Sequence, residues 1–553
     1  MNRFRTSPSF AVRLCFITVL GLSANTLLAA TLVSISVAPT SPFVSIGATQ
    51  QFTATGHYSD GTTQNLTSSA TWTPSNVAVG PVTAGLATAN GPGVNMITAS
   101  VGTINGSATL NVKVSDNFYA LDINKVTDPW PTTVGIPFGS LRSLGGQIKW
   151  ADIETCNPDI NGNHNGKDPT NPCYSWTQFD KWFVQLQSGQ NVMFTLYATP
   201  SWASSRGQNC ISSGNPPGCT GPPDTNCAFQ TQNGPGICDP PIGLNADGTG
   251  DDHYWTDFIT ALHAHVVNTY ATEWIKYWEV WNEPNISTEW NPTDPVNHKY
   301  DQLLRMAQDA YNTVKALNSQ LLVTTPAVAN ATMAVTNWLQ PYLNAGGGNY
   351  ADTITVHGYI QVGSCPTSCP LAVNVATLID NARTVMSATG QQNKPLQNTE
   401  GSWGVSSNMT DPDLEAAFTA KYYMVQIAKS VNQFSWYGFD FTNTGEFFDP
   451  NTQQLTSSGI AYQQIHAWAS GAVPTAVCSA DSNNFWTCKL KRQSGQAHTQ
   501  SVVVWDENCT DISCSAQYTV PTQYTQCVKL DGTSCTIANH HAAVGLKPIF
   551  LEN

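Results

Sequence analysis

Hydrophobic and polar positions fall into three successive patterns along the chain. Residues 31–115 alternate as half-buried strands do, for example in residues 33–37 and 108–114, and Asp60-Gly61 is a hairpin-turn signal. Residues 116–470 alternate short apolar runs with longer stretches of helical periodicity, and residues 471–553 return to strand-like alternation. The pattern predicts an N-terminal β-sandwich, a central α/β domain and a small C-terminal β-domain.

The central segment contains eight apolar runs that we interpret as strands, with helical patterns between them. One of these helices should begin at Asp411-Pro412, an N-cap residue followed by a first-turn proline. Eight strands alternating with helices predict a (β/α)₈ TIM barrel, which carries its functional groups at the C-terminal ends of the strands. The predicted strands are residues 118–124, 139–144, 192–198, 277–282, 321–325, 353–359, 395–399 and 434–440.

The charge balance narrows the range of partners. The formal net charge is −14, and only 11% of the 553 residues are charged. Nucleic acids and anionic membranes attract basic surfaces, so this composition argues against both. A polar but weakly charged chain suits a neutral ligand.

The N-terminus has the features of a secretory signal. Arg3, Arg5 and Arg13 precede an apolar run at residues 14–28, and Ala29-Ala30 supplies small residues for cleavage. We therefore expect residues 1–30 to be a signal peptide and the protein to be secreted, with the periplasm or cell surface as alternatives. No later stretch is long and apolar enough to predict a membrane span.

Cysteine usage agrees with an oxidising compartment. Apart from Cys15 the chain has fourteen cysteines, and most lie in close pairs. Close pairs in a secreted protein predict disulfides, whereas metal binding is disfavoured because no CxxC pair occurs. The expected pairs are Cys156/Cys173, Cys210/Cys219, Cys227/Cys238, Cys365/Cys369, Cys478/Cys488, Cys509/Cys514 and Cys527/Cys535.

Two glutamates follow predicted strands at the places where a barrel carries catalytic groups. Residues 276–285 form an aromatic-rich strand ending in Asn282-Glu283-Pro284, and residues 394–401 form a short strand ending in Glu400. Glycosidic bond hydrolysis with retention needs two carboxyl groups about 5–5.5 Å apart. Glu283 could instead cap a helix, and Glu400 could be a turn residue before Gly401. The joint pattern favours the catalytic interpretation.

The barrel segment resembles retaining glycoside hydrolases of clan A, and most closely glycoside hydrolase family 39. The segment at residues 51–61 with 70–72 resembles bacterial immunoglobulin-like domains of group 2, for which a spacer or adhesive role is expected. The motifs that carry the family 39 resemblance are at residues 118–124, 130–131, 138–142, 150–154, 174–176, 198–203, 281–285, 357–359 and 399–400.

The resemblance implies roles for individual residues. Glu283 would be the acid/base, which has to hold a proton near neutral pH, and Glu400 the nucleophile. Asn282 would bind the sugar 2-hydroxyl, while Arg142 and Tyr359 would orient Glu400 and stabilise its charge.

Other side chains could contact the substrate. His357 could line the same pocket, although a packed core histidine is nearly as good an interpretation. Trp436 could form the floor of the sugar site, and Trp150 and Trp202 are further candidates because sugar rings stack on aromatic faces. The long polar segment at 200–251 is expected to form a wall of the cleft.

The sequence therefore predicts a secreted retaining glycosidase that acts on a polysaccharide or oligosaccharide without a cofactor. Another clan A family, such as a cellulase or mannanase relative, would use the same two glutamates. A non-catalytic carbohydrate-binding or adhesive surface protein is the alternative from a different class. The sequence does not determine the sugar, the linkage or the oligomeric state.

Overall fold

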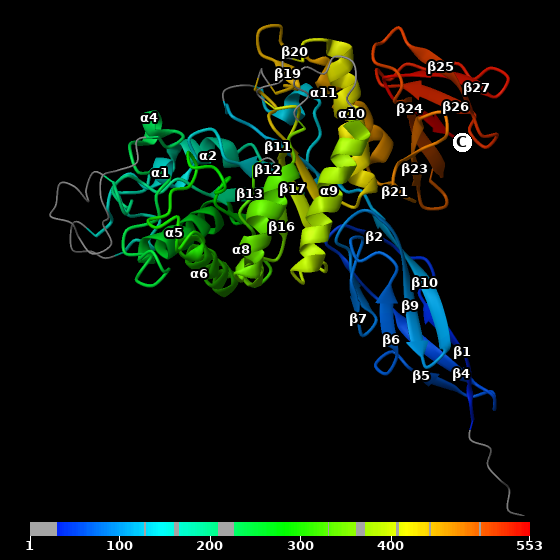
Figure 1. The fold of residues 1–553 in the computed structure, drawn as a ribbon, viewed down its shortest axis with the longest axis horizontal. Helices are drawn as coiled ribbons and strands as arrows, with labels where there is room; N and C mark the ends of the chain where they lie inside the picture. Colours follow the sequence, from blue (N-terminus) through cyan, green and yellow to red (C-terminus); the bar gives the residue numbers. More distant parts are fainter. Residues whose placement is uncertain are drawn as a thin grey trace, which may run out of the picture.

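The protein is described here by a computed structural model that covers residues 30–126, 129–159, 165–207, 226–329, 331–360, 371–404, 409–441, 444–496 and 499–553. Nearly all of the predicted signal peptide lies outside these residues, as do the expected pairs Cys210/Cys219 and Cys365/Cys369. Figure 1 shows a central barrel from which an N-terminal β-domain projects, while a C-terminal β-domain lies beside α10 and α11.

The central domain is the predicted barrel of eight parallel strands. Their hydrogen-bonded order is β15-β14-β13-β12-β11-β18-β17-β16, and a parallel bridge between Thr324 and Thr353 joins its two ends. Each strand overlaps one of the eight apolar runs. The strands are β11 (Tyr119–Asp122), β12 (Ser140–Ser143), β13 (Asn191–Leu196), β14 (Ile275–Val280), β15 (Leu322–Thr324), β16 (Ile354–His357), β17 (Leu396–Gly401) and β18 (Gln433–Trp436).

Helices surround the strands. Asp411 caps α10 by accepting a hydrogen bond from the amide of Asp413, and Pro412 occupies the first turn, as predicted. The helices are α1 (Trp150–Ile153), α2 (Thr177–Phe183), α4 (Gln230–Asn233), α5 (His253–Tyr270), α6 (Asp301–Leu317), α7 (Ala331–Ala334), α8 (Gln340–Asn344), α9 (Leu371–Ala388), α10 (Pro412–Ala428) and α11 (Ser457–Ala469). Short helices of other types are η1 (Asp116–Phe118), η2 (Pro131–Val134), η3 (Val335–Leu339) and η4 (Gly347–Tyr350).

The N-terminal domain is a small β-sandwich with its own apolar core. Its sheets have the strand orders β1-β4-β5, β2-β10-β9-β6 and β3-β8-β7. Phe52, Ile97 and Leu110 are among its fully buried side chains. The strands are β1 (Leu32–Ala38), β2 (Phe43–Ser45), β3 (Thr49–Gln51), β4 (Thr53–Tyr58), β5 (Thr63–Asn65), β6 (Thr71–Pro74), β7 (Val82–Thr83), β8 (Leu86–Thr88), β9 (Gly93–Val101) and β10 (Ile104–Lys113).

The C-terminal domain packs tightly on the barrel. Phe550 stacks on Trp468 of α11 at 5.1 Å, and Trp505 belongs to the same apolar cluster as the barrel core. Its strands are β21 (Val473–Pro474), β22 (Ser479–Ala480), β23 (Phe485–Lys491), β24 (Gln500–Asp506), β25 (Ser515–Thr519), β26 (Gln526–Lys529), β27 (His541–Gly545) and β28 (Ile549–Glu552), and the hairpin β19 (Phe448–Asp449) and β20 (Gln454–Leu455) precedes α11.

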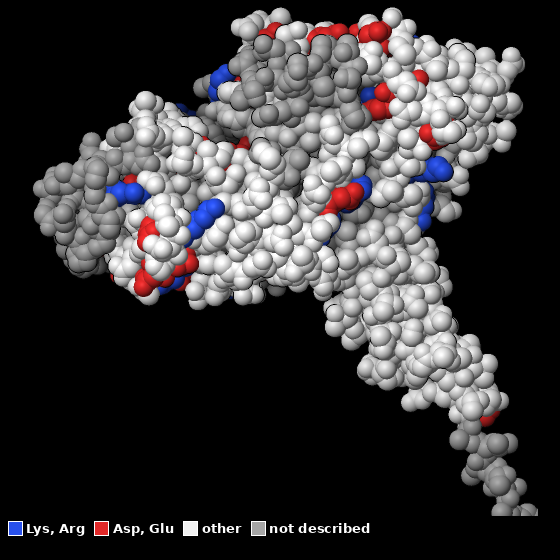
Figure 2. Space-filling view, in the orientation of Figure 1, with Lys and Arg blue, Asp and Glu red and all other residues white. Residues whose placement is uncertain are grey.

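Five of the predicted disulfides are present in the described part of the chain: Cys156–Cys173, Cys227–Cys238, Cys478–Cys488, Cys509–Cys514 and Cys527–Cys535. Within the same residues, no helix has the length and hydrophobicity needed to cross a membrane. The face in Figure 2 is largely free of charged side chains, in keeping with the composition.

Candidate active site

Glu283 lies directly beyond the C-terminal end of β14. The backbone leaves the strand through two residues with positive φ, Trp281 at 65° and Glu283 itself at 40°. Residues other than glycine rarely adopt a positive φ, and such backbone strain is concentrated at functional sites. The side chain of Glu283 is 15% exposed, so it can meet a ligand.

Glu400 reaches the barrel interior because β17 is irregular at this point. Asn398 points outward, where its amide contacts Tyr422 of α10. Strict alternation would send Glu400 outward as well, but the pairing with β16 passes from Val356–Asn398 directly to His357–Glu400. A bulge of this kind reorients the side chain that follows it. Glu400 is thereby brought to the same side of the barrel as Glu283.

The two glutamates meet at His357, the last residue of β16. Its Nδ1 lies 2.6 Å from Oε1 of Glu283 and 3.3 Å from Oε2 of Glu400. One oxygen of each carboxyl group lies within 4.8 Å of the other. Burial lowers the pKa of His357, but the adjacent carboxylates Glu400 and Glu283 raise it further, and the net pKa is above its ordinary value.

Arg142 and Tyr359 both contact Glu400. Nη1 of Arg142 lies 2.5 Å from Oε1, and the hydroxyl of Tyr359 donates to Oε2 at 2.7 Å. Burial raises the pKa of Glu400, but His357, Arg142 and the Tyr359 hydroxyl together hold it below its ordinary value. Glu400 is therefore ionised at neutral pH, as a nucleophile must be.

Two buried acids of this network did not stand out in the sequence. Arg142 also contacts Glu279 of β14 at 2.6 Å and Asp122 of β11 at 3.4 Å. Burial raises the pKa of Asp122 to about 8 against the lowering effect of Arg142, which favours the protonated form of Asp122 near neutral pH. Arg142 then faces the two carboxylates Glu279 and Glu400. The only sequence signal for these acids was a charged residue inside an otherwise apolar strand.

Asn282 is held at both ends of its amide. Its Oδ1 accepts from Arg142 at 3.0 Å, and its Nδ2 lies 3.4 Å from Oε2 of Glu289. Tyr197 also donates a hydrogen bond to Glu289. Burial raises the pKa of Glu289 to about 7. The sequence reasoning missed Glu289 and Tyr197 because both lie in loops or strand positions without a motif.

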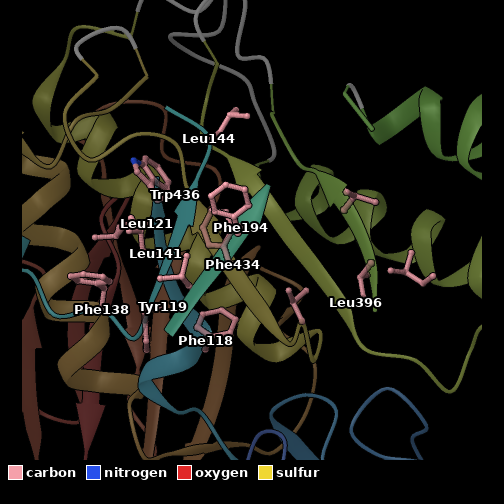
Figure 3. Packing of buried hydrophobic residues seen from close by; sticks show 14 of the residues in the cluster. Phe118, Tyr119, Leu121, Phe138, Leu141, Leu144, Phe194, Leu396, Phe434 and Trp436 are labelled. Carbon is pink, nitrogen blue, oxygen red and sulfur yellow. The ribbon is translucent and has the colours of Figure 1, made fainter. Parts of the chain in front are cut away.

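Two of the predicted tryptophan platforms are wrong. Trp436 has no exposed surface; its indole donates to the carbonyl of Gly445, and its ring stacks on Phe447. Figure 3 shows Trp436 among apolar core side chains. Trp150 is likewise fully buried and stacks on Phe258. Both tryptophans follow the general tendency of large aromatic residues on barrel strands and helices to pack into the core.

Other aromatic rings remain available near the site. Tyr437 follows Trp436, and its ring lies 6.3 Å from that of Tyr359. Burial, with Glu400 as a further cause, raises the pKa of Tyr437, so it stays a neutral hydrogen-bonding group. Trp202 is half-buried in the loop that follows β13 and lines a cavity whose lining does not include Glu283 or Glu400.

Among the described residues, Glu283, His357 and Glu400 form the one cluster of side chains whose donor atoms could share a metal ion. The guanidinium of Arg142 lies 2.5 Å from Glu400 and supplies a fixed positive charge there. A second cation at this position would be repelled, so the donor set fits acid/base and nucleophilic chemistry better than metal binding.

Comparison with known proteins gives two family matches. Residues 245–455 match glycosyl hydrolases family 39, and residues 32–112 match the bacterial Ig-like domain, group 2. A β-xylosidase of Geobacillus stearothermophilus is 30% identical over 96 residues, which are 17% of this chain and 18% of that protein. Ice-binding protein 1 of Shewanella frigidimarina is 32% identical over 148 residues, 25% of this chain and 16% of that protein.

Solved structures agree with the barrel architecture. The crystal structure of a monomeric β-xylosidase from Caulobacter crescentus superposes with a TM-score of 0.50 at 14% identity, covering 79% of this chain and 96% of that one. At this identity the likeness concerns the fold alone. The chain spans less than a fifth of the length of the two curated relatives. The family matches assign residues 245–455, which include the barrel strands β14 to β18, to glycosyl hydrolases family 39, and residues 32–112 of the same chain to the group 2 bacterial Ig-like domain.

Proposed function

We propose that the protein is a retaining glycosidase in which Glu400 is the nucleophile and Glu283 the general acid and base. The observation that carries this proposal is the pair of carboxyl groups, which approach within 4.8 Å and lie at the ends of two barrel strands. This separation suits direct attack, because an inverting enzyme keeps its carboxyl groups about 6.5–9.5 Å apart to admit a water molecule.

The reaction has two steps. The Glu400 carboxylate attacks the anomeric carbon while Glu283 gives its proton to the departing glycosidic oxygen, leaving a glycosyl ester on Glu400. Glu283 then takes a proton from water, which attacks the same carbon and releases the sugar and free Glu400. His357 contacts both carboxyl groups, so it can balance their charge as the proton moves between steps.

Asn282 supplies the hydrogen bond to the sugar 2-hydroxyl. Oδ1 accepts from Arg142 and Nδ2 directs one hydrogen at Glu289, so the second hydrogen of Nδ2 is the one that can bind the sugar. A hydrogen bond to this hydroxyl strengthens in the transition state. The substrate class that we propose is a β-linked polysaccharide or oligosaccharide, with β-xylosides as the first compounds to test because one of the two curated relatives is a β-xylosidase.

The test uses a panel of aryl β-glycosides and β-linked polysaccharides. Glu400→Gln should lower kcat by roughly 10⁴-fold or more, since the reaction loses its nucleophile. Glu283→Ala should be rescued by azide on a substrate with a good leaving group, giving a glycosyl azide with the anomeric configuration of the substrate. Glu273→Gln, a change beyond the opposite end of β14, is the matched control and should retain activity. Binding of polysaccharide without turnover by the wild type would favour an adhesive protein.

We also propose that the protein is secreted. The N-terminal sequence supports this, and the five disulfides are typical of an oxidising compartment. Expression in the native host followed by N-terminal sequencing should find the mature chain outside the cytoplasm, starting near Thr31. A cytoplasmic protein that retains Met1 would refute it.

A further inference from the structure

A cavity lies at the C-terminal end of the barrel strands, and neither Glu283 nor Glu400 is among the residues that line it. It has a volume of about 220 Å³ and lies between α1, which follows β12, and the loop that follows β13. Its lining includes Glu154, Thr155, Ser201, Trp202 and Asn233. Among the described residues, none of these five is hydrogen-bonded to Glu283 or Glu400.

The hydrogen-bond donors on one side of this cavity are already used. The indole of Trp202 donates to the carbonyl of Glu154 at 3.0 Å, and the hydroxyl of Ser201 donates to the carbonyl of Pro235 at 2.9 Å. A hydroxyl that donates its one hydrogen keeps its lone pairs as acceptors. Ser201 therefore offers an acceptor to the cavity, and Trp202 offers its apolar ring.

On the other side of the cavity, hydrogen-bond donors are again already used. The hydroxyl of Thr155 donates to the carbonyl of Cys173 at 3.0 Å, and Nδ2 of Asn233 donates to Asp152 at 2.6 Å. Oδ1 of Asn233 is buried and has no hydrogen-bond partner among the described residues. The available polar groups are thus mainly acceptors, which fit a ligand that donates several hydrogen bonds.

The protonation state of Glu154 determines whether the cavity favours a charged or a neutral ligand. The side chain of Glu154 is buried, its Oε2 accepts from the indole of Trp150 at 2.7 Å, and its Oε1 has no partner among the described residues. Burial raises the pKa of Glu154 to about 8, so the carboxyl group is neutral at pH 7. An acceptor-rich cavity without a net negative charge selects a neutral polyol over a cation.

We propose that this cavity binds one ring of a saccharide chain, with the ring packed against Trp202. Tyr254 packs against Trp202 at nearly a right angle, with ring centroids 5.1 Å apart, and so fixes the platform. The volume lies below the 300–1,000 Å³ or so of pockets for drug-sized ligands, which suits a single ring. The inference deepens the proposed function and rests on it only in assuming that the ligand is a carbohydrate.

The consequence is a preference for long substrates. A ring held away from the scissile bond adds binding energy for a chain and none for a short aryl glycoside. Loss of one aromatic contact weakens binding by up to about tenfold. Trp202→Ala should therefore raise KM for a hexasaccharide about fivefold to tenfold more than it raises KM for an aryl monoglycoside. Trp202→Phe, which keeps an aromatic ring, should recover most of the loss.

The experiment measures binding and turnover separately. Xylohexaose and cellohexaose are titrated calorimetrically into Glu400→Gln and into the double variant with Trp202→Ala, and the hexasaccharide that binds is then used for kinetics. Trp486→Ala, a change of a half-buried tryptophan in the C-terminal domain, is the matched control and should alter neither quantity. Melting temperatures verify that each variant is folded.

Each outcome has a defined meaning. Weaker binding in the Trp202→Ala double variant supports the proposal, and retention of binding by Glu154→Gln supports a neutral ligand over a cation. The proposal is overturned if neither hexasaccharide binds, if Trp202→Ala has no effect, or if it impairs both substrate lengths equally. If the protein binds a hexasaccharide through Trp202 but has no hydrolytic activity, the proposed function is refuted and the saccharide-binding proposal for this cavity still holds.

Discussion

At the scale of single residues, the site depends on how the charge of Glu400 is maintained. A fully buried carboxyl group would normally be protonated near neutral pH. Here the guanidinium of Arg142 and the hydroxyl of Tyr359 bind its two oxygens, and His357 lies beside it. These contacts outweigh burial and hold its pKa low. Each contact should therefore be visible in the pH dependence of catalysis.

Tyr359→Phe tests this directly. Removal of the hydroxyl takes away one cause of the low pKa, so the pKa of Glu400 should rise. Glu400 would then be protonated at a higher pH, and the acidic limb of the kcat/KM profile should move upward. We expect kcat to fall about 100- to 1,000-fold, as for other single donors to a catalytic charge. An unchanged acidic limb in a folded Tyr359→Phe variant would show that the hydroxyl does not stabilise the carboxylate.

At the scale of elements, the apolar runs of the sequence, together with the family resemblance, predicted eight strands and placed both glutamates at strand ends. They could not predict the bulge in β17, because Val356–Asn398 and His357–Glu400 pair across strands that are distant in sequence. The two wrong tryptophan platforms have a related cause. The hydrophobic pattern shows that Trp150 and Trp436 are apolar, but which layer covers each ring is decided by tertiary packing.

The end of α1 carries a buried acid whose protonation should affect stability. The pKa of Glu154 is about 8 in the folded protein against an ordinary 4.5. As the pH rises, the unfolded chain releases this proton at a lower pH than the folded protein does. The protonated Glu154 therefore contributes fully to the free energy of unfolding below pH 4.5, and this contribution is lost between pH 4.5 and 8. The loss is at most about 1.4 kcal/mol per pH unit.

The glutamine in Glu154→Gln cannot ionise, so the variant should lack this pH-dependent loss of stability. The free energy of unfolding of the wild type relative to the variant, from denaturant titrations at pH 5, 6, 7 and 8, should fall steadily as the pH rises. Glu273→Gln serves as the comparison, because Glu273 lies outside this cavity. A constant difference between wild type and Glu154→Gln would mean that Glu154 is already ionised in the folded protein.

At the scale of the whole molecule, the two flanking domains are attached in different ways. The C-terminal domain shares the barrel's apolar cluster, and the Lys421–Glu507 ion pair at 2.8 Å is nearly fully buried between them. The N-terminal sandwich has a separate core. Its contacts with the barrel include hydrogen bonds from Asn90 to Asn393 and from Asn432 to Asn90.

Truncation should therefore have opposite effects at the two ends. A chain that begins at Lys113 should fold and hydrolyse aryl glycosides like the full-length protein. A chain that ends at Ser470 should be insoluble or lose its cooperative thermal transition, because it would leave the buried Lys421 without Glu507 and would uncover the apolar face that Trp468 shares with Phe550. Thermal unfolding and gel filtration distinguish these results. Equal tolerance of both truncations would contradict the assignment of the C-terminal domain to the barrel core.

The central claim is that Glu400 forms a covalent bond to the sugar, and the most direct measurement of it is mass spectrometry after incubation with an activated 2-deoxy-2-fluoro-β-glycoside of the preferred sugar. The account predicts that intact protein gains the mass of one fluorosugar and that, after proteolysis, the label is found on the peptide containing Glu400. A label on a different residue, or no label together with a product of inverted anomeric configuration, would contradict it.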